Sequence, residues 1–396
     1  MKDHNIIKIL QDPVDIPPVV LEKADQAFEH IKAEALAIRP DKISGRKGSR
    51  KKIWLAAAVI AAVLGSVSVG AAVYNHWWSR GLSETLHASE EQMRQLDADS
   101  TSSQINQAVT DQGVTITAVQ SIVDNYFAHI SFKVEGYELP EGAEPGIENI
   151  EVTVDGDNKL NWSGGFYNGL VSGEDGMVEY GDGTPLAYAE DGSLIEKYVQ
   201  EDGSLEYDLV LSHSQQEKGY LFGKTIHVKF SNLGTFEKTD FHLAMEGTWE
   251  FDWTLQGNDE MKADEWDIPL GDSGVVLKET EISPISMRAV LELPKGQYTM
   301  DETEEGMNPP MLKGVVMKDG TAYPYLYPGM GGSDYLPQGS DQYTTLFALD
   351  RILDVDQVES LLFAKESVSG ENAPPEESSQ NQSLEDRFYI VPLSES

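Results

Sequence analysis

The chain has 396 residues, which is enough for two or three domains, and its formal net charge is −38. A surface this acidic repels nucleic acid, so we expect no nucleic-acid partner. Because the sequence contains no cysteine, it can form neither a disulfide nor a thiolate zinc site.

Residues 1–52 predict a short helical cytoplasmic head followed by a flexible basic tether. Apolar side chains recur at helical spacing between about residues 18 and 38, with charged residues on the opposite side. They are Val20, Ala24, Ala27, Phe28, Ile31, Ala35 and Ile38. So short a head cannot bury this stripe on itself, and we interpret the stripe as a partner-binding face. The alternatives are the lipid surface and a self-packed or frayed helix.

Residues 53–74 form an uncharged run of 22 residues that predicts a transmembrane helix. At about 1.5 Å per residue it reaches roughly 33 Å, and a bilayer core is about 30 Å thick. Cations precede the run, and Trp77 and Trp78 follow it at a position that suits lipid headgroups. The cations are Arg46, Lys47, Arg50, Lys51 and Lys52. We therefore predict a single pass through the plasma membrane, with the N-terminus cytoplasmic and the C-terminal bulk extracytoplasmic.

A cleaved signal peptide is the alternative interpretation of the apolar run. The run is longer than the roughly 7–15 apolar residues of such peptides, and a long segment precedes it, so we favour a retained anchor. Small residues recur every four positions, as at Ala57, Ala61 and Gly65, which permits close approach of two helices. A homodimer through the span is one hypothesis, and chance in an alanine-rich run is the other.

Residues 75–106 predict a stalk helix and a linker. Residues at helical spacing form its apolar stripe, which we expect to lie on the first external domain. They are Leu82, Leu86, Ser89, Met93 and Leu96. Residues 97–106 are rich in Ser, Asp and Gln and predict the linker.

Beyond Gly113 the apolar period changes to two, which predicts half-buried β-strands. The alternation is clearest at 126–134, 226–230 and 249–255. Asp-Gly pairs between such segments suit tight turns. They lie at residues 155–156, 175–176, 182–183, 191–192, 202–203 and 319–320. We predict a mainly β ectodomain with two antiparallel sandwiches, the first at 107–258 and the second at 271–396, with a disordered loop near 370–383.

No residue pattern predicts catalysis, a cofactor or a metal, and we expect that the chain is not an enzyme. The stretch 219–225 resembles a phosphate loop, but its glycines are one residue too close and a strand follows. The acidic stretch 155–158 fails as a calcium loop because Lys159 stands at a ligand position. His129 and His227 fall on polar strand faces, where no second histidine accompanies them at a spacing that binds metal.

Five stretches carry a resemblance to a known family. They are residues 16–18 (Ile-Pro-Pro), 111–117, 122–124, 247–251 and 282–286. Over most of residues 1–360 the chain is similar to an uncharacterised bacterial single-pass membrane family of unknown-function domains, some of them described as anti-sigma-factor-like. The resemblance implies an immunoglobulin-like ectodomain and a head, within residues 1–40, that sequesters an extracytoplasmic-function sigma factor. The chain departs from the zinc-binding anti-sigma type, whose motif requires cysteine.

We therefore predict a single-pass membrane signalling or regulatory protein, and the resemblance implies the anti-sigma type. Its head binds a regulatory partner in the cytoplasm, and its β domains sense or anchor in the envelope. The alternative is an envelope-binding or adhesion module without a cytoplasmic signalling role.

Overall fold

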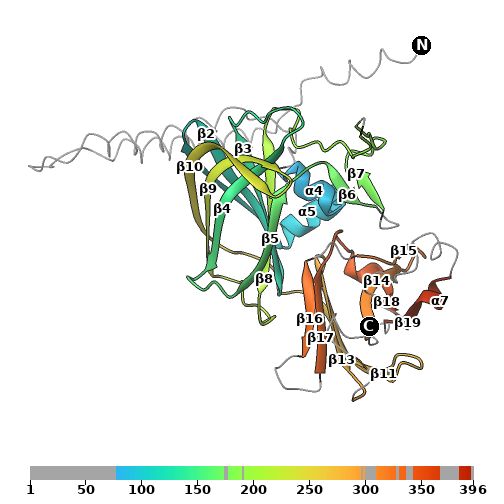
Figure 1. Cartoon of the computed structure of the whole chain (residues 1–396). Coiled ribbons are helices and arrows are strands. Elements are labelled where there is room, and N and C mark those ends of the chain that lie inside the picture. Colours follow the sequence, from blue (N-terminus) through green and yellow to red (C-terminus); the bar gives the residue numbers. More distant parts are fainter. Residues whose placement is uncertain are drawn as a thin grey trace, which may run out of the picture. The chain divides into compact units, whose positions relative to one another are not determined.

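The computed structural model describes residues 77–173, 177–189, 191–295, 298, 309–326, 330–335, 342–365 and 383–393. Within these ranges the chain is mainly β, with several antiparallel sheets and few helices (Figure 1). The predicted head, tether and span all lie outside the described residues, as does loop segment 370–382. Among the residues that are described, no helix combines the length and apolar character needed to cross a membrane.

The described chain begins with two short helices, α4 (Arg80–Thr85) and α5 (Glu90–Ala98), which we call the helical hairpin. A single stalk helix does not form, because His87 adopts a positive φ of 46° and the Ser89 side chain caps a new helix. The predicted apolar stripe is nevertheless buried at Leu82, Leu86, Met93 and Leu96. The segment predicted as a linker contains the start of strand β1 (Ser102–Asp111), a polar edge strand in which only Ser102 is buried.

The first lobe consists of two antiparallel sheets around one core. One sheet has the order β1, β2 (Val114–Val123), β3 (Phe127–Glu135), β8 (Leu205–His213) and β5 (Leu160–Phe166). The other has the order β10 (Asp240–Thr254), β9 (Thr225–Glu237) and β4 (Glu144–Val154). Side chains of both sheets meet in the core, where Phe132, Phe230 and Trp249 are fully buried. A small sheet of β6 (Leu170–Ser172) and β7 (Val178–Tyr180) lies within the connection from β5 to β8.

The second lobe also has two antiparallel sheets. The first is β11 (Lys262–Pro269), β12 (Val276–Ile282), β13 (Ser286–Glu292), β17 (Gln342–Ala348) and β16 (Gly331–Tyr335). The second is β15 (Ala322–Tyr323), β14 (Met311–Met317), β18 (Val358–Ala364) and β19 (Phe388–Pro392). Two short helices, η1 (Val355–Gln357) and α7 (Leu384–Arg387), precede β18 and β19. Strand β11 lies within residues 259–270, between the two predicted sandwiches, and its alternation is hard to detect because charged residues fill this edge strand.

The two lobes share one topology. In each five-stranded sheet the first three strands form a meander. The third strand then pairs with a later strand, which pairs in turn with the edge strand, so the order β1-β2-β3-β8-β5 corresponds to β11-β12-β13-β17-β16. The facing sheets correspond in the same way, with β4, β9 and β10 matching β14, β18 and β19. This order differs from the immunoglobulin order, in which the third strand crosses to the other sheet. A short turn after Val123 keeps β3 beside β2 instead.

The correspondence extends to individual residue pairs. Ala118 pairs with Phe132 in the first lobe, and Leu277 pairs with Leu291 at the matching place in the second. Directly after these pairs both lobes have a β-bulge, at Val119 and Lys278. An aromatic pair is shared as well, since Phe166 and Tyr207 lie 5.2 Å apart and Tyr335 and Tyr343 lie 5.5 Å apart between ring centroids. The lobes are therefore two copies of one architecture.

Candidate functional site

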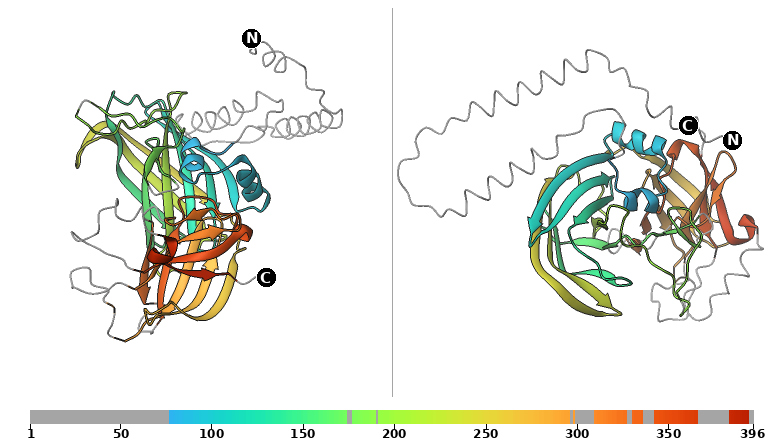
Figure 2. Two further views of the ribbon diagram at one scale, coloured as in Figure 1. Left: turned by 90° about the vertical axis from the view of Figure 1, so that its right-hand side faces the viewer. Right: turned by 90° about the horizontal axis from the view of Figure 1, so that it is seen from above.

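The helical hairpin packs where the two lobes meet (Figures 1 and 2). Its apolar side chains form one cluster with Ile122 of the first lobe and with Ile285 and Ile352 of the second. The Ile352 amide donates to the Leu86 carbonyl at 2.9 Å, and the Gln92 side chain donates to the Ile352 carbonyl at 2.8 Å. Both lobes therefore hold the hairpin.

The first lobe holds the start of α4 through side chains on the outer face of its five-stranded sheet. Gln120 of β2 accepts a hydrogen bond from the Ser79 amide at 2.8 Å. Glu206 of β8 accepts from the Arg80 amide at 3.1 Å and from the Gly81 amide. A carboxylate at this position satisfies free N–H groups and is favoured by the helix dipole.

The lobes contact each other through corresponding turns. Asp124, in the turn between β2 and β3, accepts from the Tyr126 and Phe127 amides at 2.8 and 2.7 Å. Ser283, at the matching position between β12 and β13, accepts from the Ile285 and Ser286 amides at 3.1 and 2.9 Å. The Ser283 and Ser286 hydroxyls both donate to the second carboxylate oxygen of Asp124. Burial raises the pKa of this carboxyl above its ordinary value, while the four donors act in the opposite direction.

A second buried carboxylate lies beside this contact. Glu281 of the second lobe is 3% exposed and accepts from Tyr126 and Lys218 of the first lobe. Arg288 of the second lobe donates to it at 3.1 Å. Burial alone would raise the pKa of Glu281, but the bonds from Lys218 and Tyr126 and the charge of Arg288 lower it below its ordinary value. The contact between the lobes is thus built from buried, paired polar groups.

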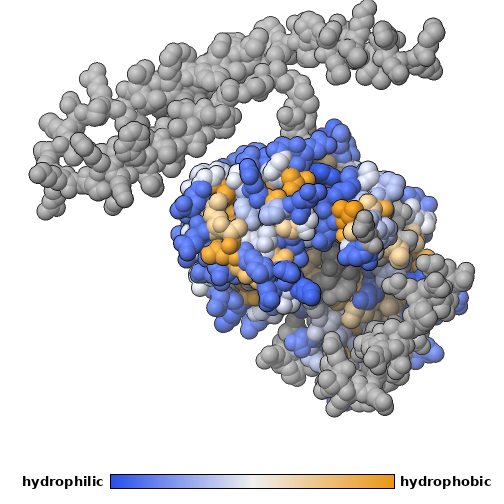
Figure 3. Space-filling model, turned by 45° about the horizontal axis from the view of Figure 1, so that its top comes forward, coloured by the Kyte–Doolittle hydropathy of each residue, from blue (hydrophilic) through white to orange (hydrophobic). Residues whose placement is uncertain are grey.

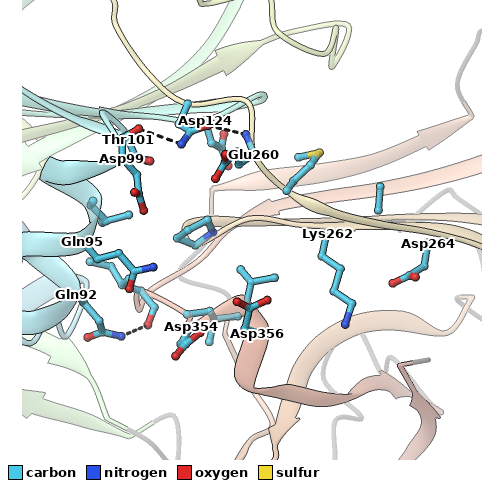
Figure 4. A pocket seen from close by; sticks show the side chains of 18 residues that line it. Gln92, Gln95, Asp99, Thr101, Asp124, Glu260, Lys262, Asp264, Asp354 and Asp356 are labelled. Atoms are coloured by element: carbon cyan, nitrogen blue, oxygen red, sulfur yellow. Dashed lines mark hydrogen bonds between the residues drawn. The ribbon is translucent and has the colours of Figure 1, made fainter. Parts of the chain in front are cut away.

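A cavity of about 580 Å³ opens beside this contact. We call it the interlobe cavity, and its walls come from α5, from residues 258–264 between the lobes, and from residues 352–356 of the second lobe (Figure 4). Leu96, Met261 and Pro284 contribute apolar surface. The lining also contains six carboxylates and one ammonium group, namely Asp99, Asp124, Glu260, Asp264, Asp354, Asp356 and Lys262.

The wall formed by residues 258–264 is fixed to both the helical hairpin and the Asp124 turn. Asn258 donates its side-chain amide to the Asp99 carbonyl at 3.0 Å, and Asn125 donates to the Asp259 carbonyl at 2.9 Å. Next to it, Gly257 lies so close to β2 that an added Cβ would come within 2.4 Å of the Val123 carbonyl oxygen. A ligand in the cavity therefore reaches both lobes, their connection and α5.

The cavity offers hydrogen-bond acceptors, negative charge and apolar contact. In the described part of the chain, no group of three or more His, Asp or Glu residues is arranged to hold a metal ion. Both oxygens of Asp124 already accept hydrogen bonds. The arrangement is suited to binding a small ligand or a peptide segment where the two lobes and α5 meet.

Most of the sequence-predicted site residues lie outside the residues that the structure describes. The partner-binding residues from Val20 to Ile38 and the cations from Arg46 to Lys52 are outside the described residues. Trp77 is half-buried, while Trp78 is 7% exposed and donates its indole N–H to Asp97 at 2.9 Å. A contact of the two tryptophans with lipid stays a prediction.

Sequence reasoning missed the cavity and the adjoining contact between the lobes, although two of the five motifs contain residues of that contact. Asp124 ends the 122–124 motif, and Ser283 and Ser286 lie in the 282–286 motif. Their distance in sequence gives no sign that the two turns touch. His129 was expected on a polar strand face, but it is 3% exposed because the outer face of its sheet is covered. Burial lowers the pKa of His129 to about 4.

Comparisons with known proteins add little about function. No curated protein matches the chain. Among solved structures, the crystal structure of a conserved domain protein from Bacillus anthracis is similar, with 16% identity and a TM-score of 0.39 over 74% of this chain and 89% of that chain. A domain of unknown function, DUF4179, is found at residues 45–136, which extend from the basic tether to the end of β3.

Proposed function

We propose that this chain is a single-pass membrane signalling or regulatory protein with an anti-sigma-factor-like arrangement. Residues 1–52 face the cytoplasm, residues 53–74 cross the plasma membrane, and the two lobes lie outside it as β-sandwich domains. The charge asymmetry around the apolar run supports this orientation. The DUF4179 match supports treating tether, span and hairpin as parts of one unit, because it runs through all three.

The observation that carries the proposal is the position of the helical hairpin. It follows the predicted span by a few residues, packs against both lobes, and contributes Gln92, Gln95 and Leu96 to the interlobe cavity. A ligand that prefers one arrangement of the lobes shifts the population of that arrangement. Because α5 is part of the cavity wall, the shift also changes the element that leads to the membrane. In this proposal the external lobes bind the signal (the input side), and the cytoplasmic head binds the regulatory partner (the output side).

The output side rests on the apolar stripe from Val20 to Ile38. A bacterial two-hybrid assay of residues 1–52 against the extracytoplasmic-function sigma factors of the same genome tests it. We expect at least one interaction, and we expect Phe28→Asp or Ile31→Asp to abolish it. Glu29→Gln and Lys32→Gln, on the charged side of the same helix, are matched controls that should retain it. An interaction with none of the sigma factors would refute the sigma-binding part of the proposal.

The input side is tested in cells that carry the full chain and a reporter for the interacting factor. Ala263 lines the interlobe cavity and is exposed, so Ala263→Trp fills space there without disturbing a core. Glu265→Trp, on the same strand but outside the lining, is the control. We expect a severalfold change of reporter output for the first variant only. Equal output from both variants would show that the cavity is not the input.

A deletion of residues 1–40 separates this proposal from the alternative of an envelope-binding or adhesion module. Signalling requires the head, so the deletion should abolish the response. If the deletion strain keeps its phenotype and the two-hybrid assay is negative, the alternative holds.

A further inference from the structure

A second hollow, of about 890 Å³, lies at the start of α4. We call it the α4 groove. Its walls are formed by residues 77–80 and Glu84, by Val119, Lys133 and Glu206 of the first lobe, and by parts of the connection between β5 and β8. It is separate from the interlobe cavity, with which it shares no lining residue.

The groove exists because the two lobes differ in one connection. In the first lobe, residues 167–204 join β5 to β8, whereas only residues 336–341 join the corresponding strands β16 and β17. We call residues 167–204 the insert. It is fastened to α4 by the Tyr167 hydroxyl, which donates to Glu84, and by the His87 ring, which lies 2.7 Å from the Ser172 carbonyl. The groove is therefore an addition to a duplicated architecture, and additions of this kind commonly carry function.

One buried side chain in the groove lacks part of its hydrogen bonding. Gln200 is 8% exposed, and its carbonyl oxygen accepts from the Arg80 guanidinium at 3.0 Å. Its amide nitrogen is buried and has no hydrogen-bond partner among the described residues. An unsatisfied buried donor is costly, so an acceptor oxygen brought by a ligand would be favoured at this point.

The three cations of the groove, Arg80, Lys133 and Lys197, are already paired with carboxylates. Lys133 contacts Asp202 at 2.7 Å, and Lys197 contacts Asp182 at 2.9 Å. Arg80 contacts Glu84 at 2.6 Å. A free anion would have to compete with these carboxylates for the three cations. A neutral ligand rich in hydroxyl groups would not, because hydroxyls both donate to carboxylates and accept from ammonium and amide groups.

Apolar surface completes the groove. Trp77 is half-buried and forms one wall, and Val199, which is 51% exposed, lies at another. Sugar rings present C–H groups on one face and hydroxyls around the edge, so they bind to an aromatic wall that is bordered by planar polar side chains. On Figure 3 the visible surface is largely hydrophilic with small separate hydrophobic patches, which suits a solvent-exposed glycan partner better than a broad apolar one.

We propose that the α4 groove binds an uncharged oligosaccharide. One sugar ring packs on Trp77, an acceptor oxygen of the same or the next residue takes the hydrogen bond of the Gln200 amide, and the paired carboxylates accept from sugar hydroxyls. The insert supplies one side of the site, and the second lobe has no counterpart of it. This inference does not depend on the interlobe cavity or on a cytoplasmic partner.

The test uses the full chain in a detergent without a sugar headgroup. Titration calorimetry and tryptophan fluorescence measure binding of two probes, the hexamer of N-acetylglucosamine and cellohexaose. We expect binding of at least one probe, with a tenfold or greater loss in Trp77→Ala and in Gln200→Leu. Trp162→Ala is the matched control, because Trp162 is 39% exposed and lies outside the groove. Its affinity should equal that of the unmodified chain.

Val199→Arg adds a variant that blocks the groove from an exposed position and leaves the core intact. It should also lose at least tenfold in affinity while keeping its melting temperature. The proposal is overturned if neither glycan binds, or if Val199→Arg and Trp77→Ala bind as well as Trp162→Ala does. It is also overturned if inorganic phosphate or spermidine displaces the bound glycan, since the groove would then be an ion site.

Discussion

Replacing Asp124 by alanine tests whether the corresponding turns hold the two lobes together. The carboxylate is 1% exposed and accepts four hydrogen bonds. Two come from its own turn and two from the Ser283 and Ser286 hydroxyls of the other lobe. The substitution therefore removes a local contribution to the turn and a contribution to the contact between the lobes.

The expected loss in the free energy of unfolding follows from these four hydrogen bonds. Each hydrogen bond to an ionised group contributes about 1.5–3 kcal/mol, so the pair between the lobes amounts to about 3–6 kcal/mol at most. The Ser283 hydroxyl has another acceptor nearby, the Ser286 carbonyl at 3.5 Å, which reduces its loss. We expect Asp124→Ala to lower the free energy of unfolding by about 4 kcal/mol, half of it from the contact between the lobes.

Urea unfolding at pH 8, followed by tryptophan fluorescence, measures this effect. The set consists of Asp124→Ala, the double variant Ser283→Ala/Ser286→Ala, and the triple variant. Because the three side chains form one network, we expect their effects to be non-additive by about 2 kcal/mol. Asp155→Ala is the matched control, since Asp155 also accepts a backbone hydrogen bond within the first lobe, from the Thr225 amide at 2.9 Å, but is exposed. Additive effects, or an Asp124→Ala loss no larger than that of the control, would refute the reasoning.

Three further predictions concern His129, the start of α4 and the connection between the lobes. The folded-state pKa of His129 is about 4, below the ordinary 6.5, so the unfolded chain binds a proton first as pH falls. The contribution of His129 to the free energy of unfolding is therefore complete above pH 6.5 and declines by roughly 3 kcal/mol toward pH 4. Thermal melts over this pH range should show the decline, and His129→Asn should remove the part that comes from this side chain. Glu206→Ala should cost about 1–3 kcal/mol and speed hydrogen exchange at the Arg80 and Gly81 amides, whereas unchanged exchange would exclude the capping role. Gly257→Ala should cost about 1–3 kcal/mol in urea melts because its Cβ would overlap the Val123 carbonyl, while Gly165→Ala, with open space around it, should be neutral.

Much of the β architecture could be predicted from the sequence because each strand carries its own alternation. The predicted strand at 126–134 matches β3 (Phe127–Glu135) to within a residue. Edge strands were harder to detect, since β1 and β11 bury almost none of their side chains and consist largely of polar residues. The duplication was invisible as well, because matched positions such as Val119 and Lys278 share a place in the sheet but not a chemistry.

The candidate sites could not be predicted, because each depends on groups that are brought together by packing. Asp124 and Ser283 are separated by 159 residues in sequence, and Gln200 meets Arg80 only because the insert folds back on α4. Local patterns determine which face of a strand is apolar, but they carry no information on which surface will cover it. His129 shows the consequence, since its position on a strand was predicted correctly and its burial was not.

The duplication also indicates where function is to be sought. Two copies of one architecture have the same core requirements, so positions that serve folding should recur in both, as the bulges and the Phe166–Tyr207 and Tyr335–Tyr343 pairs do. Two large features that break the correspondence, the helical hairpin and the insert, belong to the first half. Both are adjacent to the predicted span in sequence or by contact with α4. Selection for folding alone gives no reason for this asymmetry, whereas a chain that passes information from an external ligand to the membrane requires it at this end.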